Sequence, residues 1–163
     1  MYAWQFAKAQ RVARTPFVSM QNHYNLVYRE EEREMIPQCI DQGVGVVPWS
    51  PLARGLLAGT RTREGDRLTS RARTDSFGDS LYTPEVDFAV VDRVAEVAGE
   101  RGLPPARVAL AWLLHKPGVS APIVGATKVE HVEDALAAVE LSLSAEEIAR
   151  LEERYVPHAV SGH

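Results

Sequence analysis

The sequence predicts an α/β protein whose parallel β-sheet is part of a larger sheet. Short β-branched segments alternate along the chain with longer segments of helical spacing, which is the rhythm of βα units. Only three strands can be recognised, and three parallel strands would leave both edges of their sheet unpaired. The 163 residues are enough for one domain with a hydrophobic core.

Composition argues against several functional classes. The net charge of −4 disfavours a partner held by bulk charge, such as nucleic acid or an anionic membrane surface, and no apolar run approaches the roughly 18 residues of a membrane span. The single cysteine, Cys39, excludes an internal disulfide and is typical of a reducing cytoplasm, where we expect the protein. Cys39 lies on the apolar side of a predicted helix, so burial is favoured over catalysis. The five histidines lack metal-ligand spacing, and we expect no metal site.

The first third of the chain predicts a helix, a strand and a second helix. Apolar spacing predicts a helix over 2–14, which Thr15-Pro16 ends. A strand follows over 17–21, and its end carries a polar cluster (Gln21, Asn22, His23, Tyr24 and Asn25). The acidic run 29–34 begins a helix that ends before Gly43, and its charges are predicted to form a solvated face.

The stretch 43–59, GVGVVPWSPLARGLLAG, predicts a buried strand followed by a shaped loop. Its valines are β-branched and bounded by glycines, and Pro48 marks the end of the strand. Trp49 and Ser50 then emerge at the carboxyl end, where parallel α/β folds bind ligands. A core tryptophan followed by an ordinary turn is an equally good interpretation of this stretch alone.

The polar segment 60–82 contains five arginines and predicts either a functional loop or a solvated one (Arg61, Arg63, Arg67, Arg71 and Arg73). Thr83-Pro84 begins a helix that Gly102 ends. A second helix over 104–115 is apolar nearly all round and is therefore predicted to be buried.

The last third predicts a strand and two capped helices. The strand is expected over 122–124, and Thr127-x-x-Glu130 resembles a capping box whose helix buries Val132, Leu136 and Val139. Backbone donors at Gly125 and at this helix start suit an anion, although the same pattern occurs without any ligand. Ser144-x-x-Glu147 begins a final helix with Ile148 and Leu151 inward.

Four stretches, in order, resemble the aldo-keto reductase family, in particular the branch that includes the potassium-channel β subunits and many bacterial reductases. They are SMQNHYNL (19–26), GVGVVPWSPLARGLL (43–57), ALAWLL (109–114) and PIVGATKVEHVEDAL (122–136). The resemblance implies the C-terminal half of a (β/α)8 TIM barrel over residues 1–163. Strands six to eight would lie at 17–21, within 43–59 and at 122–125, and 60–82 would be a loop on the cofactor side. The family's catalytic Asp, Tyr, Lys and His belong to the first half, so no catalytic residue is expected here.

The resemblance also implies cofactor-binding residues for NADP(H). Gln21 matches the residue that binds the nicotinamide amide, and Trp49 matches the ring that stacks on the nicotinamide. The remaining positions fall into three groups. Those along the pyrophosphate are Ser50, Pro51, Leu52 and Arg54, and Arg71 resembles an arginine near the adenosine phosphate. Those at the 2′-phosphate site are Gly125, Thr127, His131 and Asp134. His131, Asp134 and Ala135 depart from the Gln or Arg, Glu and Asn that are usual in the family.

Three hypotheses follow. The first is an NADPH-dependent reductase of aldehydes and ketones, present as a part that is inactive alone because the catalytic tetrad is missing, with a small carbonyl substrate in the full-length form. The second is a non-catalytic NADP(H)-binding or interaction module. The third is a half-barrel that completes itself by self-association through its open sheet edges.

Overall fold

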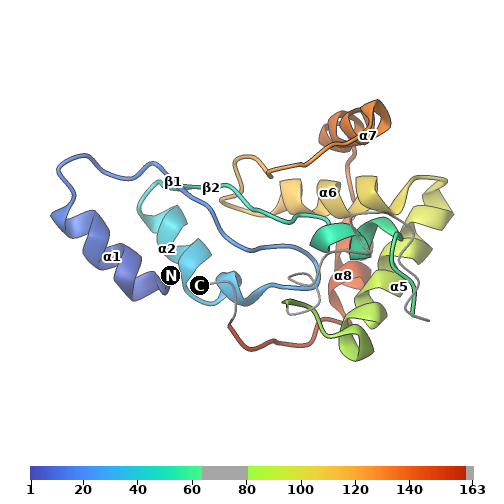
Figure 1. Ribbon diagram of the computed structural model, residues 1–163, viewed down its shortest axis with the longest axis horizontal. Helices are drawn as coiled ribbons and strands as arrows, with labels where there is room; N and C mark the ends of the chain where they lie inside the picture. The colour runs from blue at the N-terminus through green and yellow to red at the C-terminus, as the bar shows by residue number, and fades with distance from the viewer. Residues whose placement is uncertain (64–80, 161–163) are drawn as a thin grey trace.

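The computed structural model describes residues 1–63 and 81–160, and these form a mixed α/β structure (Figure 1). In chain order the elements are α1 (Ala3–Val12), β1 (Ser19–Met20), η1 (Glu30–Glu32), α2 (Met35–Asp41), β2 (Gly45–Val46), η2 (Ala53–Ala58), α5 (Pro84–Arg101), α6 (Pro105–His115), α7 (Val129–Val139) and α8 (Ala145–Glu152). Most of the loop predicted over 60–82, including Arg71, lies outside the described residues.

The two strands pair in parallel, as predicted, with Ser19 opposite Gly45 and Met20 opposite Val46. Both are shorter than the sequence suggests. The side chain of Gln10 explains the late start of β1, because it bonds the backbone nitrogen of Phe17 at 2.8 Å and its carbonyl oxygen at 3.0 Å. Phe17 is thereby held beside α1 instead of in the sheet ladder.

The strand predicted over 122–124 is wrong. Pairing with β2 occurs earlier, as a single parallel bridge between Val46 and Val119. Within 122–124, only the Ile123 amide bonds the second segment, donating to the Pro48 oxygen at 2.8 Å. Pro122 has no backbone N–H, so the pairing cannot continue as a regular ladder.

Helices α5, α6 and α8 form where the capping residues and apolar spacing predict them. Gly102 ends α5 in the left-handed conformation, with φ +62°. Helix α6 is buried along Val108–Leu113, as its apolar composition predicts. The α8 capping box forms, since Ser144 Oγ accepts from the Glu147 amide at 3.1 Å, and Leu151 is fully buried. The core lies among these helices and the underside of the strands.

The helix predicted from residue 29 to residue 42 divides into η1 and α2, and its charges are not simply solvated. Glu30 is only 6% exposed. Arg29 bonds Glu32 at 2.7 Å and Glu152 at 3.0 Å. Lys116 joins the same two carboxylates, at 3.2 and 2.7 Å. The charged run is therefore a structural ion-pair network that links η1 to α6 and α8.

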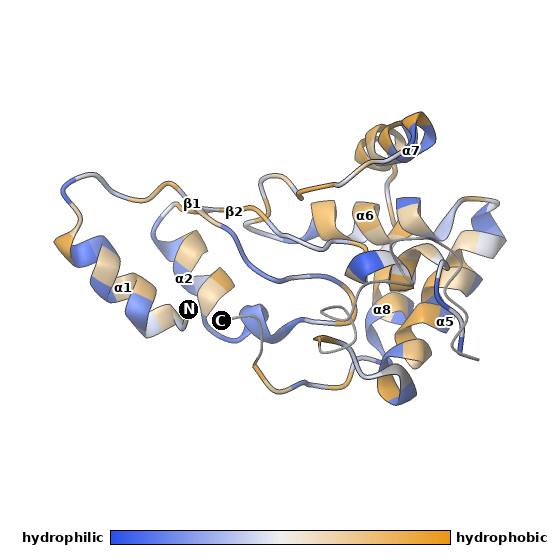
Figure 2. Ribbon diagram, viewed as in Figure 1, coloured by the Kyte–Doolittle hydropathy of each residue, from blue (hydrophilic) through white to orange (hydrophobic). Residues whose placement is uncertain are grey.

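Helix α7 departs from the prediction in two ways. It begins at Val129 with Lys128 as N-cap and no side-chain cap, so the Thr127 capping box does not form. Its stripe of Val132, Leu136 and Val139 is exposed by 46%, 65% and 64%, where burial was predicted. Figure 2 shows α7 at the edge of the helical body, next to α6, and carrying apolar residues. The apolar spacing correctly predicts an amphipathic helix, but no other part of the described chain covers its apolar face.

No helix within residues 1–63 and 81–160 is both long and apolar enough to cross a membrane.

Candidate functional site

The carboxyl ends of the strand segments meet at one edge of the molecule. The Trp49 amide donates to the Asn22 oxygen at 2.8 Å, which joins the end of the first segment to the end of the second. The bond from Ile123 to Pro48 joins the third segment to the same edge. Gln21, Trp49 and Gly125 each lie within two residues of these bonds. The parallel arrangement therefore brings together three of the predicted cofactor residues.

The loop after Trp49 has an unusual backbone. Ser50, Ala53 and Arg54 adopt φ values of +52°, +47° and +55°, and Gly55 has φ +97°. A non-glycine residue in the left-handed region typically costs about 1–3 kcal/mol, and such strain gathers at functional sites. Three such residues within five positions argue against the ordinary turn that the sequence also allowed.

Side chains from neighbouring segments hold this loop in place. The amide group of Asn25 donates to the Ser50 carbonyl at 2.9 Å, and the Thr60 hydroxyl donates to the Gly55 carbonyl at 3.0 Å. Leu52 packs against the core, and Pro51 is buried. The strained backbone is thus fixed before any ligand binds.

Trp49 lies in an aromatic stack. The ring of His23 is sandwiched between Trp49, at 4.3 Å between centroids and 16° between planes, and Tyr28, at 4.2 Å and 12°. Trp49 is half-buried, whereas His23 and Tyr28 are buried. His23 thus supports one face of the indole and fixes its orientation.

His23 is a neutral, hydrogen-bonded core residue. Its Nε2 lies 2.9 Å from the Tyr82 hydroxyl, to which Asn25 also donates at 3.2 Å. Burial, with a smaller contribution from the positive charges of His158 and Arg54, lowers the pKa of His23 to about 4. Burial likewise raises the pKa of Tyr82. The pair is therefore uncharged near neutral pH.

Sequence reasoning did not identify this supporting set. The polar run 21–25 at the end of the first strand is the signal in the sequence for His23 and Asn25. Tyr82 was assigned to a polar loop, yet it is only 7% exposed. Nothing local indicates that a residue 59 positions away closes over His23.

The residues predicted for the 2′-phosphate lie around the start of α7. Gly125, Thr127 and His131 are exposed. The Thr127 amide donates to Nδ1 of His131 at 3.4 Å. Asp134 instead forms an ion pair with Arg107 of α6 at 2.7 Å, so its carboxylate secures α7 to the body of the protein. The structure thus separates Asp134 from the exposed set.

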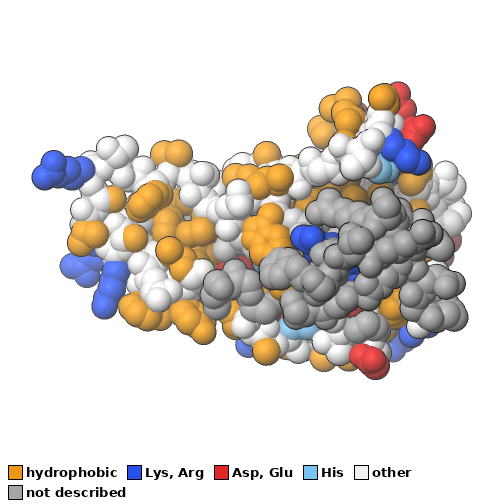
Figure 3. Space-filling model, viewed as in Figure 1, with side chains coloured by type: hydrophobic (Ala, Val, Ile, Leu, Met, Phe, Trp, Pro, Cys, Tyr) orange, Lys and Arg blue, Asp and Glu red, His pale blue; other side chains and the backbone are white. Residues whose placement is uncertain are grey.

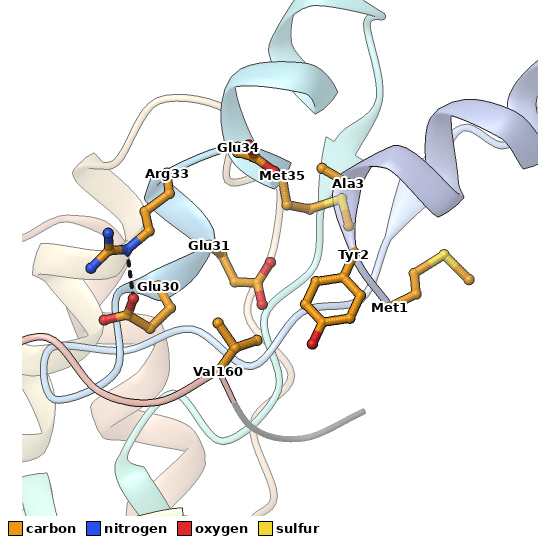
Figure 4. Close-up of a pocket in the computed structure, with 9 residues that line it drawn as sticks. All are labelled: Met1, Tyr2, Ala3, Glu30, Glu31, Arg33, Glu34, Met35 and Val160. Carbon is orange, nitrogen blue, oxygen red and sulfur yellow. Dashed lines mark hydrogen bonds and ion pairs between the residues drawn. The ribbon is translucent and has the colours of Figure 1, made fainter.

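A pocket of about 330 Å³ lies elsewhere, between the start of α1, η1 and the C-terminal segment (Figure 4). Its lining includes Tyr2, Glu31, Met35 and Val160, and none of the predicted cofactor residues. Within the described ranges, no group of His, Cys, Asp and Glu is arranged to hold a metal ion. Cys39 is buried, as predicted, and burial raises the pKa of its thiol to about 11.

Comparison with known proteins agrees with this arrangement. The model of the aldo/keto reductase family matches residues 1–155. A putative aryl-alcohol dehydrogenase of Schizosaccharomyces pombe is 48% identical over 99% of this chain and 46% of its own length. Versiconal hemiacetal acetate reductase of Aspergillus parasiticus is 45% identical over 98% of this chain and 48% of its own length.

A solved structure gives the same result at the level of fold. The crystal structure of the thermostable aldo-keto reductase Tm1743, in complex with the inhibitor epalrestat, matches with a TM-score of 0.65 and 29% identity. The match covers 91% of this chain and 43% of that structure. The chain spans about half the length of the curated relatives it matches. On the family match and these relatives together, the chain belongs to the aldo/keto reductase family.

Proposed function

We propose that this chain is the NADP(H)-binding half of a reductase that converts aldehydes or ketones into alcohols, and that the complete protein has the (β/α)8 barrel of its family. The observation that carries the proposal is the position of Trp49. It lies at the carboxyl end of the strands, is stacked on His23 and is followed by a loop with three non-glycine residues at positive φ. The matched relatives named as a reductase and a dehydrogenase support this class over a non-catalytic module.

The residues present fit a dinucleotide. His23 covers one face of the Trp49 indole, and the half-buried ring keeps part of its surface accessible for a nicotinamide. Gln21 is exposed at the end of β1, where its amide can pair with a carboxamide. Ser50 and Arg54 lie on the fixed loop beside Trp49 and would hold the pyrophosphate.

The same proposal assigns the 2′-phosphate to the start of α7. The backbone amides near Gly125 and the Nε2–H of His131 would hold it, because these groups are exposed and can donate to an anion, while the Thr127 amide donates to His131 Nδ1 and orients that ring. Asp134 is paired with Arg107 at 2.7 Å in this structure, so its role toward the cofactor stays a prediction. Ala135 has no polar group for the adenine, so this end of the cofactor would be held mainly through its phosphates.

The chemistry that NADPH would supply when bound is a hydride for the carbonyl carbon. The side chains of this chain orient the cofactor: Trp49 sets the ring plane, and the neutral His23 with Tyr82 keeps Trp49 in position. Neither His23 nor Tyr82 is placed to donate a proton, because both are buried and bonded to each other. The proton donor and the rest of the substrate pocket would come from the other half of the barrel.

The experiment is a titration of the pure 163-residue chain with NADPH by calorimetry, together with an assay of aldehyde-dependent NADPH oxidation. We expect binding without turnover. Trp49→Ala should weaken NADPH binding about five- to twelvefold, which corresponds to the loss of one aromatic stack of roughly 1–1.5 kcal/mol. Trp49→Phe keeps a ring and is the matched control. No binding at millimolar NADPH, or turnover above background, would contradict the proposal.

A further inference from the structure

The C-terminal segment, residues 153–160, folds back over the side chains that support Trp49. The Tyr155 hydroxyl donates to the Glu30 carboxylate at 2.6 Å. The His158 amide donates to the same oxygen, Oε1 of Glu30, at 2.8 Å. Figure 1 shows this segment running back from α8 toward α2. The end of the described chain is therefore docked on η1, which follows the first strand of the candidate site.

The imidazole of His158 lies at one end of a row of four rings that leads to Trp49. Its centroid lies 6.3 Å from that of Tyr28, with an angle of 55° between the ring planes. Tyr28 stacks on His23 at 4.2 Å between centroids, and His23 stacks on Trp49 at 4.3 Å. Tyr28 is fully buried, and the side chain of His158 is 11% exposed. The support of the indole thus extends through packed rings into the C-terminal segment.

A second set of contacts joins His158 to the stack through the start of α5. Nε2 of His158 pairs with Oδ1 of Asp87 at 2.7 Å, and Oδ2 of Asp87 accepts from the Thr83 amide at 2.7 Å. Tyr82 directly precedes Thr83, and its hydroxyl lies 2.9 Å from Nε2 of His23. The row of rings reaches His23 at a face of its imidazole, and this second set reaches it at Nε2. Both contacts that orient His23 therefore depend on where His158 docks.

We propose that His158 is a positioning residue for the nicotinamide ring: paired with Asp87 and packed behind Tyr28, it fixes the stack that sets the plane of Trp49. The proposal rests on the proposed function, because that function assigns the cofactor ring to Trp49. Within residues 1–63 and 81–160, the bonds and ring contacts of His158 go to four residues outside the predicted cofactor set, Glu30, Asp87, Tyr28 and Tyr155. His158 thus acts on the cofactor only through the stack, by fixing the indole before the cofactor binds.

The first test is a double-mutant cycle on NADPH affinity, measured by calorimetry with the 163-residue chain. His158→Ala should weaken NADPH binding about two- to fivefold, less than Trp49→Ala, because a displaced indole still offers part of its surface. In the Trp49→Ala background, His158→Ala should have no further effect, since the ring that His158 positions is absent. Equal losses in the two backgrounds, or no loss in the wild-type background, would overturn the proposal.

Two variants of α8 control for a general loss of stability. Leu151→Ala removes a buried side chain and Ser144→Ala removes the helix cap, and both positions lie outside the row of rings. Neither should change the dissociation constant of NADPH, although both lower the free energy of unfolding. A change as large as that of His158→Ala in both controls would contradict a positioning role. If His158→Ala does not fold by circular dichroism, His158→Gln takes its place, because glutamine keeps a donor for Asp87 but lacks the ring behind Tyr28.

The second test needs no cofactor and separates this proposal from the proposed function. In the ¹⁵N-labelled chain without NADPH, His158→Ala should shift or broaden the indole N–H signal of Trp49, because the support of the ring is loosened. The Trp4 signal should stay, since Trp4 is exposed on α1, at the end of the molecule where Figure 3 shows apolar and basic side chains on the surface.

The two tests give distinguishable outcomes. A Trp49 signal that is the same in wild type and in His158→Ala overturns the proposal, even if the chain binds NADPH. A Trp49 signal that responds to His158→Ala in a chain that does not bind NADPH supports the positioning of Trp49 by His158 and counts against the proposed function alone.

Discussion

An ion pair secures the C-terminal segment. Because one partner is a histidine that loses its charge as pH rises, this pair should make the free energy of unfolding depend on pH. His158 Nε2 lies 2.7 Å from the Asp87 carboxylate, and the two side chains are 11% and 2% exposed. The hydrogen bond to Asp87 raises the pKa of His158, and the charges of Asp87 and Glu30 act in the same direction. Glu30 also accepts from the His158 backbone amide at 2.8 Å, and the rings of Tyr28 and Tyr155 face the imidazole.

The magnitude follows from what remains around Asp87 when His158 is removed. Breaking a buried ion pair typically costs about 3–5 kcal/mol, because a charge is left without its partner. Asp87 would keep its bond from the Thr83 amide at 2.7 Å and its place in the first turn of α5, where the helix dipole favours an acid. We therefore expect His158→Ala to lower the free energy of unfolding by about 2 kcal/mol near pH 6.

The sign of the pH dependence is fixed by the direction of the shift. Because the pKa of His158 is raised on folding, its contribution is fully present below the unfolded value of about 6.5 and is lost as pH rises through the higher folded value. His23, with its pKa lowered to about 4, acts oppositely: it reduces stability as pH falls below about 6.5. The wild-type protein alone would mix the two effects.

The assay is therefore a comparison of wild type with His158→Gln by urea unfolding at several values between pH 5.5 and pH 9. Glutamine keeps an N–H donor without the charge. Most of the lowering of the His23 pKa comes from burial, which is common to both proteins, so most of the His23 contribution cancels in the difference. The difference in unfolding free energy should be largest at the acidic end and should shrink as pH rises. A difference that stays constant or grows with pH would refute the reasoning.

Three further predictions concern the body of the protein. Leu151→Ala should lower the free energy of unfolding by about 2–4 kcal/mol, because the side chain is fully buried and its removal leaves a cavity. The control Val160→Ala, at an exposed position, should change the free energy of unfolding by under about 0.5 kcal/mol. Equal losses in the two variants would be inconsistent with the described core. Ser144→Ala should cost about 1 kcal/mol by removing the α8 cap, and Ser144→Asp should retain most of it, as measured by thermal unfolding. Cys39 should react with a thiol reagent only as fast as the protein opens, because the side chain is buried and the pKa of its thiol is raised to about 11. Rapid labelling of the native protein would argue against a buried Cys39.

Local signals predicted α5, α6 and α8 well, and contacts between distant residues account for much of what the sequence did not predict. Gly102 and the Ser144 capping box define helix ends through their own backbone chemistry, so the prediction needed no knowledge of the rest of the fold. The start of β1 depends on Gln10, and the pairing expected at 122–124 depends on β2; local patterns contain neither contact. Strand pairing is set by such tertiary contacts more than by propensity.

In the candidate site, too, local sequence features were predictable and contacts between distant residues were not. The resemblance placed Trp49 and its loop at the carboxyl end of a strand, and the structure agrees. The stack on His23 and the closure by Tyr82 could not be predicted, because the two residues are far apart in the sequence. The apolar spacing of α7 alone predicted that its stripe is buried. Spacing does not show whether another surface is present to cover the stripe.

The central claim is that the Trp49 indole receives the cofactor, and the indole N–H signals of the chain test it directly. The three tryptophans report on separate places: Trp4 on α1, Trp49 at the candidate site, and Trp112 in the core, where its Nε1 donates to Glu152 at 2.8 Å. In a titration of ¹⁵N-labelled protein with NADPH, the Trp49 signal should move and the signals of Trp4 and Trp112 should stay. An unmoved Trp49 signal at saturating NADPH, or movement confined to Trp4 or Trp112, would contradict the account.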